Sequence, residues 1–429
     1  MGRAMKDTEI QWIGKIPDEW RLERLKRILD ERKEKNDPQQ TDFILSLGAA
    51  YGVIPYSEKE GGGNKAKETL TDYRLAYPND IVMNSMNIIS GSVGISRYFG
   101  CVSPVYYMLY PRDNSYSPDY FCYLFQTTAF QRSLLGLGNG ILMKESSTGN
   151  FNTVRMRIPM EKLGAQPLPV PPSEEQYRIA HFLDSRCSRI DSVIEKTRLS
   201  IEDYKKLKQS LVMEATSRGI RGERTLKESG LEWITRVPTE WRVTKAKHVL
   251  TKLEREMLPT DEIVICSNSG LVFYRGDKST GLVSMTENGY QGVEPGDLLI
   301  HGMDTWHGAI AVSTIRGKCT SVVHVCDSKE NKQYIAYYLQ SLAFRNVYKA
   351  ITNGVRQNTS DYRSWDKAGT IQLILPPYDE QCEIAAYLDK KCAEIDKLIE
   401  KKSALLEEMS NYKKAVIYEY VTGKKEVPA

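Results

Sequence analysis

Glu9-Ile10-Gln11-Trp12-Ile13-Gly14-Lys15-Ile16-Pro17-Asp18-Glu19-Trp20-Arg21 lies near the start of the chain, and a related stretch returns as Gly230-Leu231-Glu232-Trp233-Ile234-Thr235-Arg236-Val237-Pro238-Thr239-Glu240-Trp241-Arg242. Both tryptophans recur at one offset of 221 residues (233 − 12 and 241 − 20). A repeat of this length and spacing indicates that the chain of 429 residues contains two copies of one plan.

A second repeated motif closes each copy. Pro171-Pro172-Ser173-Glu174-Glu175-Gln176 recurs as Pro376-Pro377-Tyr378-Asp379-Glu380-Gln381, at an offset of 205 (376 − 171). The segments between the opening and closing motifs differ in content, and they differ by 16 residues in length (221 − 205). Constant ends around different middles predict one scaffold that carries two different recognition surfaces.

The composition indicates a globular protein of two or more domains. A chain of 429 residues is too long for one hydrophobic core, and its apolar fraction of 41% is sufficient for folding. It has no run of about 18 apolar residues, so we expect no membrane partner. The net charge of +4 permits a nucleic-acid partner without requiring one.

The eight cysteines are scattered, and none forms a C-x-x-C pair. We therefore expect reduced thiols in a cytoplasmic protein, and no metal site. Cys319, His324 and Cys326 lie close in sequence, but no fourth ligand accompanies them.

Two long helices are expected after the proline pairs, over residues 173–217 and 379–421. Ser173 and Gln176 have the spacing of a capping box, and Asp379 is the expected cap of the second helix. At 1.5 Å per residue, each helix is on the order of 60 Å long.

Both helices carry an apolar seam with coiled-coil spacing. The seam positions are Leu183, Cys187, Ile190, Ile194, Ile201, Tyr204 and Leu211 in the first helix, and Leu388, Cys392, Ile395, Ile399, Leu406, Met409 and Val416 in the second. Because an amphipathic helix must bury its stripe, an antiparallel coiled coil between the two is the favoured arrangement. The alternative is that each helix packs on its own domain.

Short strand-like runs and a few helices fill the segments 21–170 and 242–375. We predict an α+β fold class: two globular α/β domains of similar fold, joined by the two long helices. The expected boundaries are 1–172 for the first domain (with the repeated arm at 8–29), 173–217 for the central helix, 218–229 for a hinge, 230–377 for the second domain, and 378–429 for the C-terminal helix and tail.

The opening Trp-Ile-Gly-x-Ile-Pro-x-x-Trp and the helix start Pro-Pro-x-x-Glu-Gln-x-x-Ile-Ala-x-x-Leu-Asp resemble motifs of the specificity (S) subunit of Type I DNA restriction–modification enzymes. Both motifs occur twice and in the right order, so the resemblance covers the whole chain. Two departures are Thr235, where the opening has glycine, and Ser217-Arg218-Gly219, which matches Thr422-Gly423-Lys424 only loosely.

The resemblance implies two target-recognition domains, 1–172 and 230–377, each reading one half of a split site in double-stranded DNA. It also implies that the long helices set the distance between the domains and dock two methyltransferase (modification) subunits. Restriction/translocase subunits would complete the complex. The chain itself would be non-catalytic, with S-adenosylmethionine, ATP and Mg²⁺ bound by the partner subunits and no cofactor or metal bound by this chain.

Several sequences only look catalytic. Leu375 precedes Pro376-Pro377-Tyr378, and leucine cannot bind a target amine as the Asn or Asp of amino-methyltransferases does. The glycine-rich stretch 136–140 lacks the setting of a dinucleotide loop, and no G-x-x-x-x-G-K-[ST] sequence is present. Asp304 and His307 flank Trp306, and we favour a loop near DNA or a structural turn over a catalytic cluster there.

The candidate DNA-binding residues are Lys, Arg, Asn, Gln and Ser side chains of the two middles, which suit contacts to phosphates and base edges. The strongest segment, 352–360, contains Arg356, Gln357 and Asn358 and is followed by Arg363; its counterpart, 141–148, contains Lys144. The others are Asn84, Asn87, Ser92 and Arg97 in the first domain and Arg275, Lys278, Arg316 and Lys318 in the second. For each residue, a solvated surface position is an equally good interpretation.

The sequence therefore favours a DNA-reading subunit in which each domain contacts about three to five base pairs, mostly in the major groove. The half-site centres would lie about one DNA turn apart, roughly 34 Å. One alternative is a fused nuclease–methyltransferase, and the absent motifs argue against it. The other is a duplicated coiled-coil adaptor that binds proteins without sequence-specific DNA binding.

Overall fold

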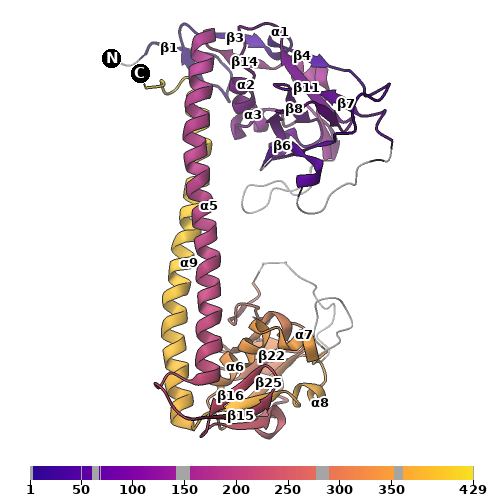
Figure 1. The fold of residues 1–429 in the computed structure, drawn as a ribbon. Coiled ribbons are helices and arrows are strands. Elements are labelled where there is room, and N and C mark those ends of the chain that lie inside the picture. The colour runs from indigo at the N-terminus through magenta and orange to yellow at the C-terminus, as the bar shows by residue number, and fades with distance from the viewer. Residues whose placement is uncertain are drawn as a thin grey trace. The chain divides into compact units, whose positions relative to one another are not determined.

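The computed structural model describes residues 3–49, 51–59, 67, 69–141, 155–276, 289–351 and 361–428. Its internal contacts divide the chain into two units, Met1–Thr197 with Leu405–Ala429 (unit 1) and Arg198–Ala404 (unit 2). The long helices α5 (Ser173–Arg218) and α9 (Tyr378–Val421) each contribute one part to each unit (Figure 1).

Unit 1 is built on a four-stranded antiparallel sheet in the order β4-β11-β8-β9, formed by Leu29–Arg32, Tyr106–Pro111, Ile81–Asn84 and Val93–Ile95. Five two-stranded sheets surround it: β1 (Met5–Asp7) with β2 (Lys15–Pro17), β3 (Arg21–Arg24) with β14 (Pro167–Val170), β5 (Leu45–Gly48) with β6 (Gly52–Pro55), β7 (Arg74–Ala76) with β10 (Gly100–Val102), and β12 (Asn139–Ile141) with β13 (Arg155–Arg157). The shorter helices are α1 (Leu25–Ile28), α2 (Pro118–Phe125), α3 (Thr128–Ser133), α4 (Met160–Gly164), η1 (Tyr56–Glu58) and η2 (Ile88–Ser90).

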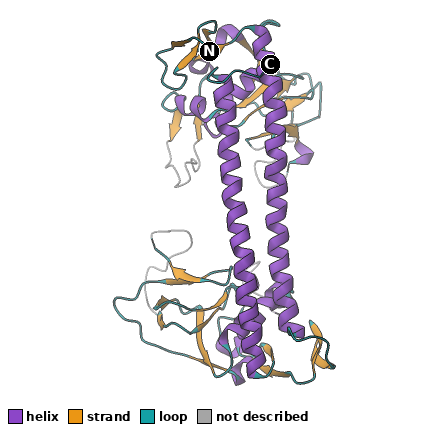
Figure 2. Ribbon diagram, turned by 90° about the vertical axis from the view of Figure 1, so that its left-hand side faces the viewer, coloured by secondary structure: helices purple, strands orange, loops and turns teal. Residues whose placement is uncertain are grey.

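Unit 2 repeats this topology. Its four-stranded sheet has the order β18-β25-β22-β23, formed by Leu250–Lys252, Val323–Ser328, Leu298–His301 and Ile310–Val312. The two-stranded sheets are β15 (Leu226–Leu231) with β16 (Ile234–Pro238), β17 (Arg242–Lys245) with β26 (Gln372–Leu375), β19 (Val264–Cys266) with β20 (Val272–Tyr274), and β21 (Gln291–Val293) with β24 (Gly317–Cys319). The helices are α6 (Lys332–Phe344), α7 (Val347–Ile351), α8 (Trp365–Ala368), η3 (Ala246–His248) and η4 (Thr305–His307). The α+β class and the shared domain fold are confirmed (Figure 2).

Each unit has an aromatic core under its tryptophan motif. In unit 1, Trp20 packs with Tyr120, Phe121 and Phe125, all of them buried. In unit 2, Trp241 joins Tyr334 and Tyr338 in the same way. Helix α2 begins at Pro118, because Ser117 accepts a hydrogen bond from the Tyr120 N–H and Pro118 occupies the first turn.

The long helices pair in antiparallel fashion within each unit. In unit 1, the rings of Phe182 and Tyr420 lie 4.6 Å apart, and Arg186 donates to the Tyr412 hydroxyl at 2.7 Å. Residue numbers therefore rise along α5 as they fall along α9.

The same direction holds in unit 2, where Lys402 lies over the ring of Tyr204 at 5.8 Å and Lys208 pairs with Asp396 at 2.7 Å. The sequence predicted the antiparallel pairing, and each unit shows it. The alternative holds in part as well, because Leu183 and Cys187 of α5 also lie in the core of unit 1.

The expected seam residues lie on the sheltered side of both helices. Eight of the fourteen are buried, and the remaining six are partly buried. The exposed apolar side chains of the helices, such as Leu199 and Leu398, fall at positions outside the seam.

Two expected helix caps are wrong. Helix α9 begins at Tyr378, so Asp379 lies inside its first turn, and the Pro377 carbonyl accepts the first helical hydrogen bond, from the Gln381 N–H. The Pro172 carbonyl has the same role at α5 and accepts from the Gln176 N–H, while the Gln176 side chain turns away to bond Pro171 and Ser117. The expected hinge is also shorter than 218–229, because Arg218 ends α5 and β15 begins at Leu226.

Candidate nucleic-acid interface

The two repeated motifs meet within each unit. In unit 1, the indole N–H of Trp20 donates to the buried Glu175 carboxylate at 2.9 Å, and Arg3 donates to both oxygens of that carboxylate at 2.6 and 2.8 Å. In unit 2, Trp241 donates to Glu380 at 3.1 Å, and Arg224 pairs with the same carboxylate. The pKa values of both arginines are raised, chiefly by these hydrogen bonds.

Arg3 and Arg224 share the offset of 221 (224 − 3), and the sequence did not single them out because both lie before the repeated tryptophan motif. A glutamine beside each glutamate adds a second link between helix and domain. Gln176 accepts from the Ser117 N–H, and Gln381 accepts from the Asn331 N–H, both at 2.9 Å. The repeated motifs therefore join each domain to the start of a long helix, and surfaces that differ between the copies must come from the middles.

One turn in the middles has the same backbone in both units. It follows the central strand of the large sheet: residues 84–92 follow β8, and residues 301–309 follow β22, at an offset of 217 (301 − 84). Asn84 N–H bonds the Ser92 carbonyl at 3.0 Å, and His301 N–H bonds the Ala309 carbonyl at 3.0 Å. Gly91 and Gly308 end the short helices η2 and η4 with φ of 82° and 85°, values that favour glycine.

The side chains that follow this common backbone differ. Asn87 and Ser90 are exposed in unit 1, where unit 2 has Asp304 and an exposed His307. At the first position of the turn, the Asn84 side-chain oxygen accepts a hydrogen bond from the Met86 N–H at 3.1 Å. The equivalent His301 accepts through Nδ1 from the Asp304 N–H at 3.0 Å. Burial lowers the pKa of His301. The candidates Asn84 and Asn87 thus lie together on one turn, whereas Ser92 is buried.

In each unit, the chain that follows the candidate segment (141–148 or 352–360) forms a backbone hydrogen bond with this turn. Ile158 N–H bonds the Ser85 carbonyl at 3.1 Å, and Tyr362 N–H bonds the Gly302 carbonyl at 3.0 Å. Exposed Arg363 is the next residue in unit 2. Lys144, Lys278, Arg356, Gln357 and Asn358 lie outside the described residues. In each unit the turn therefore lies next to residues that follow the candidate segment in the sequence.

The remaining basic candidates bond within their own domains. Arg97 pairs with Asp119 at 3.2 Å. Arg316 pairs with Asp261 at 2.9 Å and with Glu294 at 3.0 Å, so two carboxylates balance its charge. Lys318 is only 8% exposed, and Arg275 is partly buried. Burial and internal pairing leave Arg316 and Lys318 as weaker DNA-binding candidates than the exposed turn.

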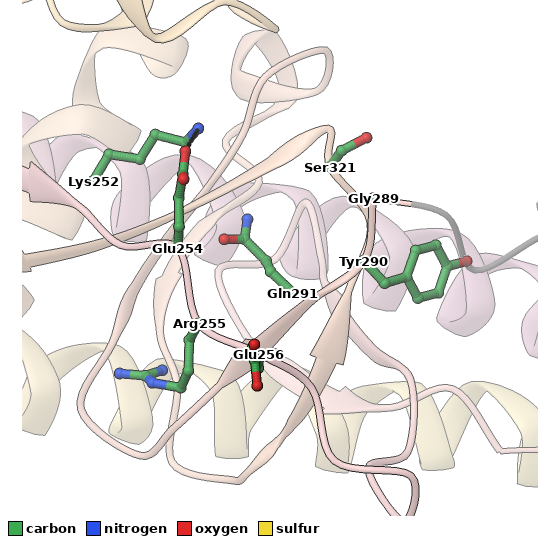
Figure 3. A pocket seen from close by; sticks show the side chains of 8 residues that line it. All are labelled: Lys252, Glu254, Arg255, Glu256, Gly289, Tyr290, Gln291 and Ser321. Atoms are coloured by element: carbon green, nitrogen blue, oxygen red, sulfur yellow. Dashed lines mark hydrogen bonds and ion pairs between the residues drawn. The ribbon is translucent and has the colours of Figure 1, made fainter.

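A polar cleft of about 350 Å³ opens beside β21 in unit 2 (Figure 3). Two basic residues, Lys252 and Arg255, and two acidic residues, Glu254 and Glu256, line this cleft. Gly289, Tyr290, Gln291 and Ser321 complete the lining. Arg255 is committed to Asp297, and Gln291 donates to the Val323 carbonyl at 2.8 Å. The balanced charge does not favour a phosphate group in this cleft.

The cysteines behave as core groups. All eight are unpaired thiols, and burial raises the pKa of Cys319 and Cys326 to about 12. Their neighbour His324 is buried, with Nε2 2.6 Å from the Tyr362 carbonyl. Among the described residues, no three His, Cys, Asp or Glu side chains gather as metal ligands, and no helix there is long and apolar enough to cross a membrane.

Comparisons with known proteins found one similar curated protein and several similar solved structures. No family model matches the chain. A curated relative from Methanocaldococcus jannaschii, the "Putative type I restriction enzyme MjaX specificity subunit", is 25% identical over 420 residues, which cover 92% of this chain and 90% of the relative.

A solved structure shares the fold. A chain from a study of complex assembly and conformational transition of the type I R-M system matches with a TM-score of 0.66 and 13% identity, covering 96% of this chain and 99% of that chain. The HsdS subunit from Thermoanaerobacter tengcongensis matches with a TM-score of 0.48 and 15% identity, covering 96% and 98%. With its duplicated domains, paired helices and near full-length match, the chain is similar to the curated specificity subunit of a type I restriction enzyme.

Proposed function

We propose that the chain is the DNA sequence-recognition subunit of a type I restriction–modification complex. The observation that carries this proposal is the match to the M. jannaschii specificity subunit along 92% of the chain. The fold supports it, because one domain plan occurs twice and carries different side chains on a common backbone. Each domain reads one half of a bipartite, asymmetric site.

In this proposal, the partner subunits carry out methyl transfer, translocation and cleavage. Two methyltransferase subunits dock on the helices and domains and bring S-adenosylmethionine, and each modifies one adenine of a half-site. Restriction/translocase subunits add ATP- and Mg²⁺-dependent translocation and cleavage. This chain contributes binding and orientation alone. The adaptor alternative has no observation that favours it.

The test is co-expression of the chain with its methyltransferase subunit in cells that lack other adenine methylation, followed by methylome sequencing. We expect one bipartite motif with two unlike halves and a fixed spacer. Absence of any motif from an assembled complex, or methyl transfer by the purified chain alone, would overturn the proposal.

The helices are proposed to set the spacer. A matched insertion of one heptad into α5 near Leu199 and α9 near Ser403 adds about 10 Å of helix and keeps the seam in register. We expect the number of unread base pairs to rise by about three, at 3.4 Å per base pair, with both half-sites unchanged. Altered half-site sequences would contradict the spacer role.

A further inference from the structure

The internal duplication separates positions that support the fold from positions that are free to differ. Bonds that recur in both units, such as those of Glu175 and Glu380, belong to the frame. Positions with the same backbone but different exposed polar side chains are the ones that can distinguish two half-sites. The turns 84–92 and 301–309 meet this description at two pairs of positions, Asn87 with Asp304 and Ser90 with His307.

The two turns share a hydrogen-bond frame beyond their closing pair. Ser90 N–H bonds the Asn87 carbonyl at 3.1 Å, and Gly91 N–H bonds the Ile88 carbonyl at 2.9 Å. The equivalent bonds of His307 to Asp304 and Gly308 to Thr305 are both 2.9 Å. A shared frame holds side chains of different chemistry in equivalent places, as recognition requires.

Each turn is also held from beneath. Ile88 and Ile89 are buried in the core of unit 1, and Thr305 is buried in unit 2. The Cβ of a residue at position 91 would come within 3.3 Å of the Gln131 amide, which itself donates to the Phe125 carbonyl. The exposed side chains therefore project from a fixed platform, and the cost of ordering them on a ligand is small.

We propose that these two turns set the base preference of the two half-sites, through Asn87 and Ser90 in unit 1 and Asp304 and His307 in unit 2. This inference rests on the proposed function. The ligand is the major-groove edge of duplex DNA, and the side chains assign different bases to the two turns.

The polar side chains at the exposed side of the two turns suit different base pairs. The side-chain amide of Asn87 is exposed, makes no hydrogen bond within the described residues, and offers the donor and acceptor that adenine N7 and N6 require. The Asp304 carboxylate, with Oδ2 3.4 Å from His301 Nδ1, has further acceptor capacity that suits the cytosine amine, and exposed His307 offers a donor that suits guanine. Unit 1 is thus assigned an A·T pair, and unit 2 a G·C pair, at equivalent positions of their half-sites.

The test exchanges the turns within the full chain, assembled with its methyltransferase subunits. Variant one carries Asn84→His, Asn87→Asp and Ser90→His; variant two carries His301→Asn, Asp304→Asn and His307→Ser. The structure favours folding of both, since each new side chain already occupies the equivalent backbone in the other unit. Asn114→Asp, an exposed change in unit 1 away from the turn, is the matched control.

Methylome sequencing should show a changed base pair in one half-site for each variant and an unchanged other half. Affinity for the original half-site should fall about tenfold or more relative to the changed one, as expected for loss of a bidentate base contact. The control should keep both halves.

Three outcomes separate the claims. If the wild-type complex yields no bipartite motif, the proposed function fails. If the wild type yields one and both exchanged variants keep it, this inference fails while the proposed function stands. If an exchange unfolds the chain, the exposed pair Asn87→Ala and Ser90→Ala replaces it, and an unchanged first half-site in that folded variant overturns the inference.

Discussion

Trp20 donates its indole N–H to the carboxylate of Glu175 at 2.9 Å, although the two residues are 155 positions apart in the chain. The carboxylate is buried in the first turn of a long helix, where Arg3 also binds it. The same arrangement of Trp241, Glu380 and Arg224 occurs in unit 2. This contact explains why two short motifs, far apart in sequence, are repeated together.

Glu175→Ala should destabilise unit 1 strongly, because it leaves the Trp20 N–H and the Arg3 guanidinium without their acceptor. Loss of one partner from a buried ion pair costs about 3–5 kcal/mol. Trp20→Phe removes a single hydrogen bond to a charged group and should cost about 1.5–3 kcal/mol. The measurement is denaturant unfolding of the full chain.

The matched control for this prediction is Glu174→Ala, since Glu174 is exposed on the same turn of α5. It should change the free energy of unfolding by no more than about 0.5 kcal/mol. Equal effects of Glu174→Ala and Glu175→Ala would show that the Trp20 contact contributes nothing specific.

The seam of the long helices should be sensitive to truncation at Leu183, which is fully buried. Leu183→Ala is expected to cost about 2–5 kcal/mol, because it removes apolar contact and leaves a cavity. Leu199→Ala on the same helix is the comparison, since that side chain is 57% exposed and should change stability by at most about 0.5 kcal/mol. Thermal unfolding monitored by circular dichroism distinguishes them, and equal losses would contradict the assigned seam.

Thiol labelling of the native protein should be slow at seven of the eight cysteines. These seven are buried, and burial raises the pKa of Cys101 to about 11 and of Cys122 to about 12, so little thiolate forms near neutral pH. Cys382 is partly exposed and should react first. Mass spectrometry after brief alkylation at pH 8 should find one modified site, lost in Cys382→Ser, and rapid labelling of all eight before denaturation would refute this.

Unit 2 should lose stability as the pH falls from 7 to 5.5, because burial lowers the pKa of His324 in the folded state. The unfolded chain then binds a proton, at an ordinary pKa of about 6.5, where the folded imidazole stays neutral. The contribution of neutral His324 to the free energy of unfolding is therefore complete above a pH of about 6.5. Below that pH it is lost at up to about 1.4 kcal/mol per pH unit.

Denaturant unfolding against pH measures this effect. His324→Gln should flatten the slope, since an amide can still donate to the Tyr362 carbonyl but does not titrate in this range. His248→Gln, which changes an exposed histidine of the same unit, should leave the slope as in the wild type. If His324→Gln left the slope unchanged, a group other than His324 would cause the pH dependence of stability.

The amino-acid sequence by itself determined the duplication, the two long helices with their seams, and the mixed strand and helix character of both domains. These are local or periodic signals, such as the repeated Trp20 motif and the spacing from Leu183 to Leu211, and they can be read without knowing which residues meet. It also identified Asn84 and Asn87 as candidates. It misplaced the helix caps, because proline carbonyls begin the two helices.

Only the tertiary structure decided which of these residues act together. It joined Arg3 to Glu175, gave Arg316 two internal carboxylates, and showed that the turns at Asn84 and His301 share one backbone. The physical reason is that each of these relationships depends on groups far apart in the chain or on three-dimensional burial. No local pattern records the distance between an arginine and a carboxylate 172 residues away.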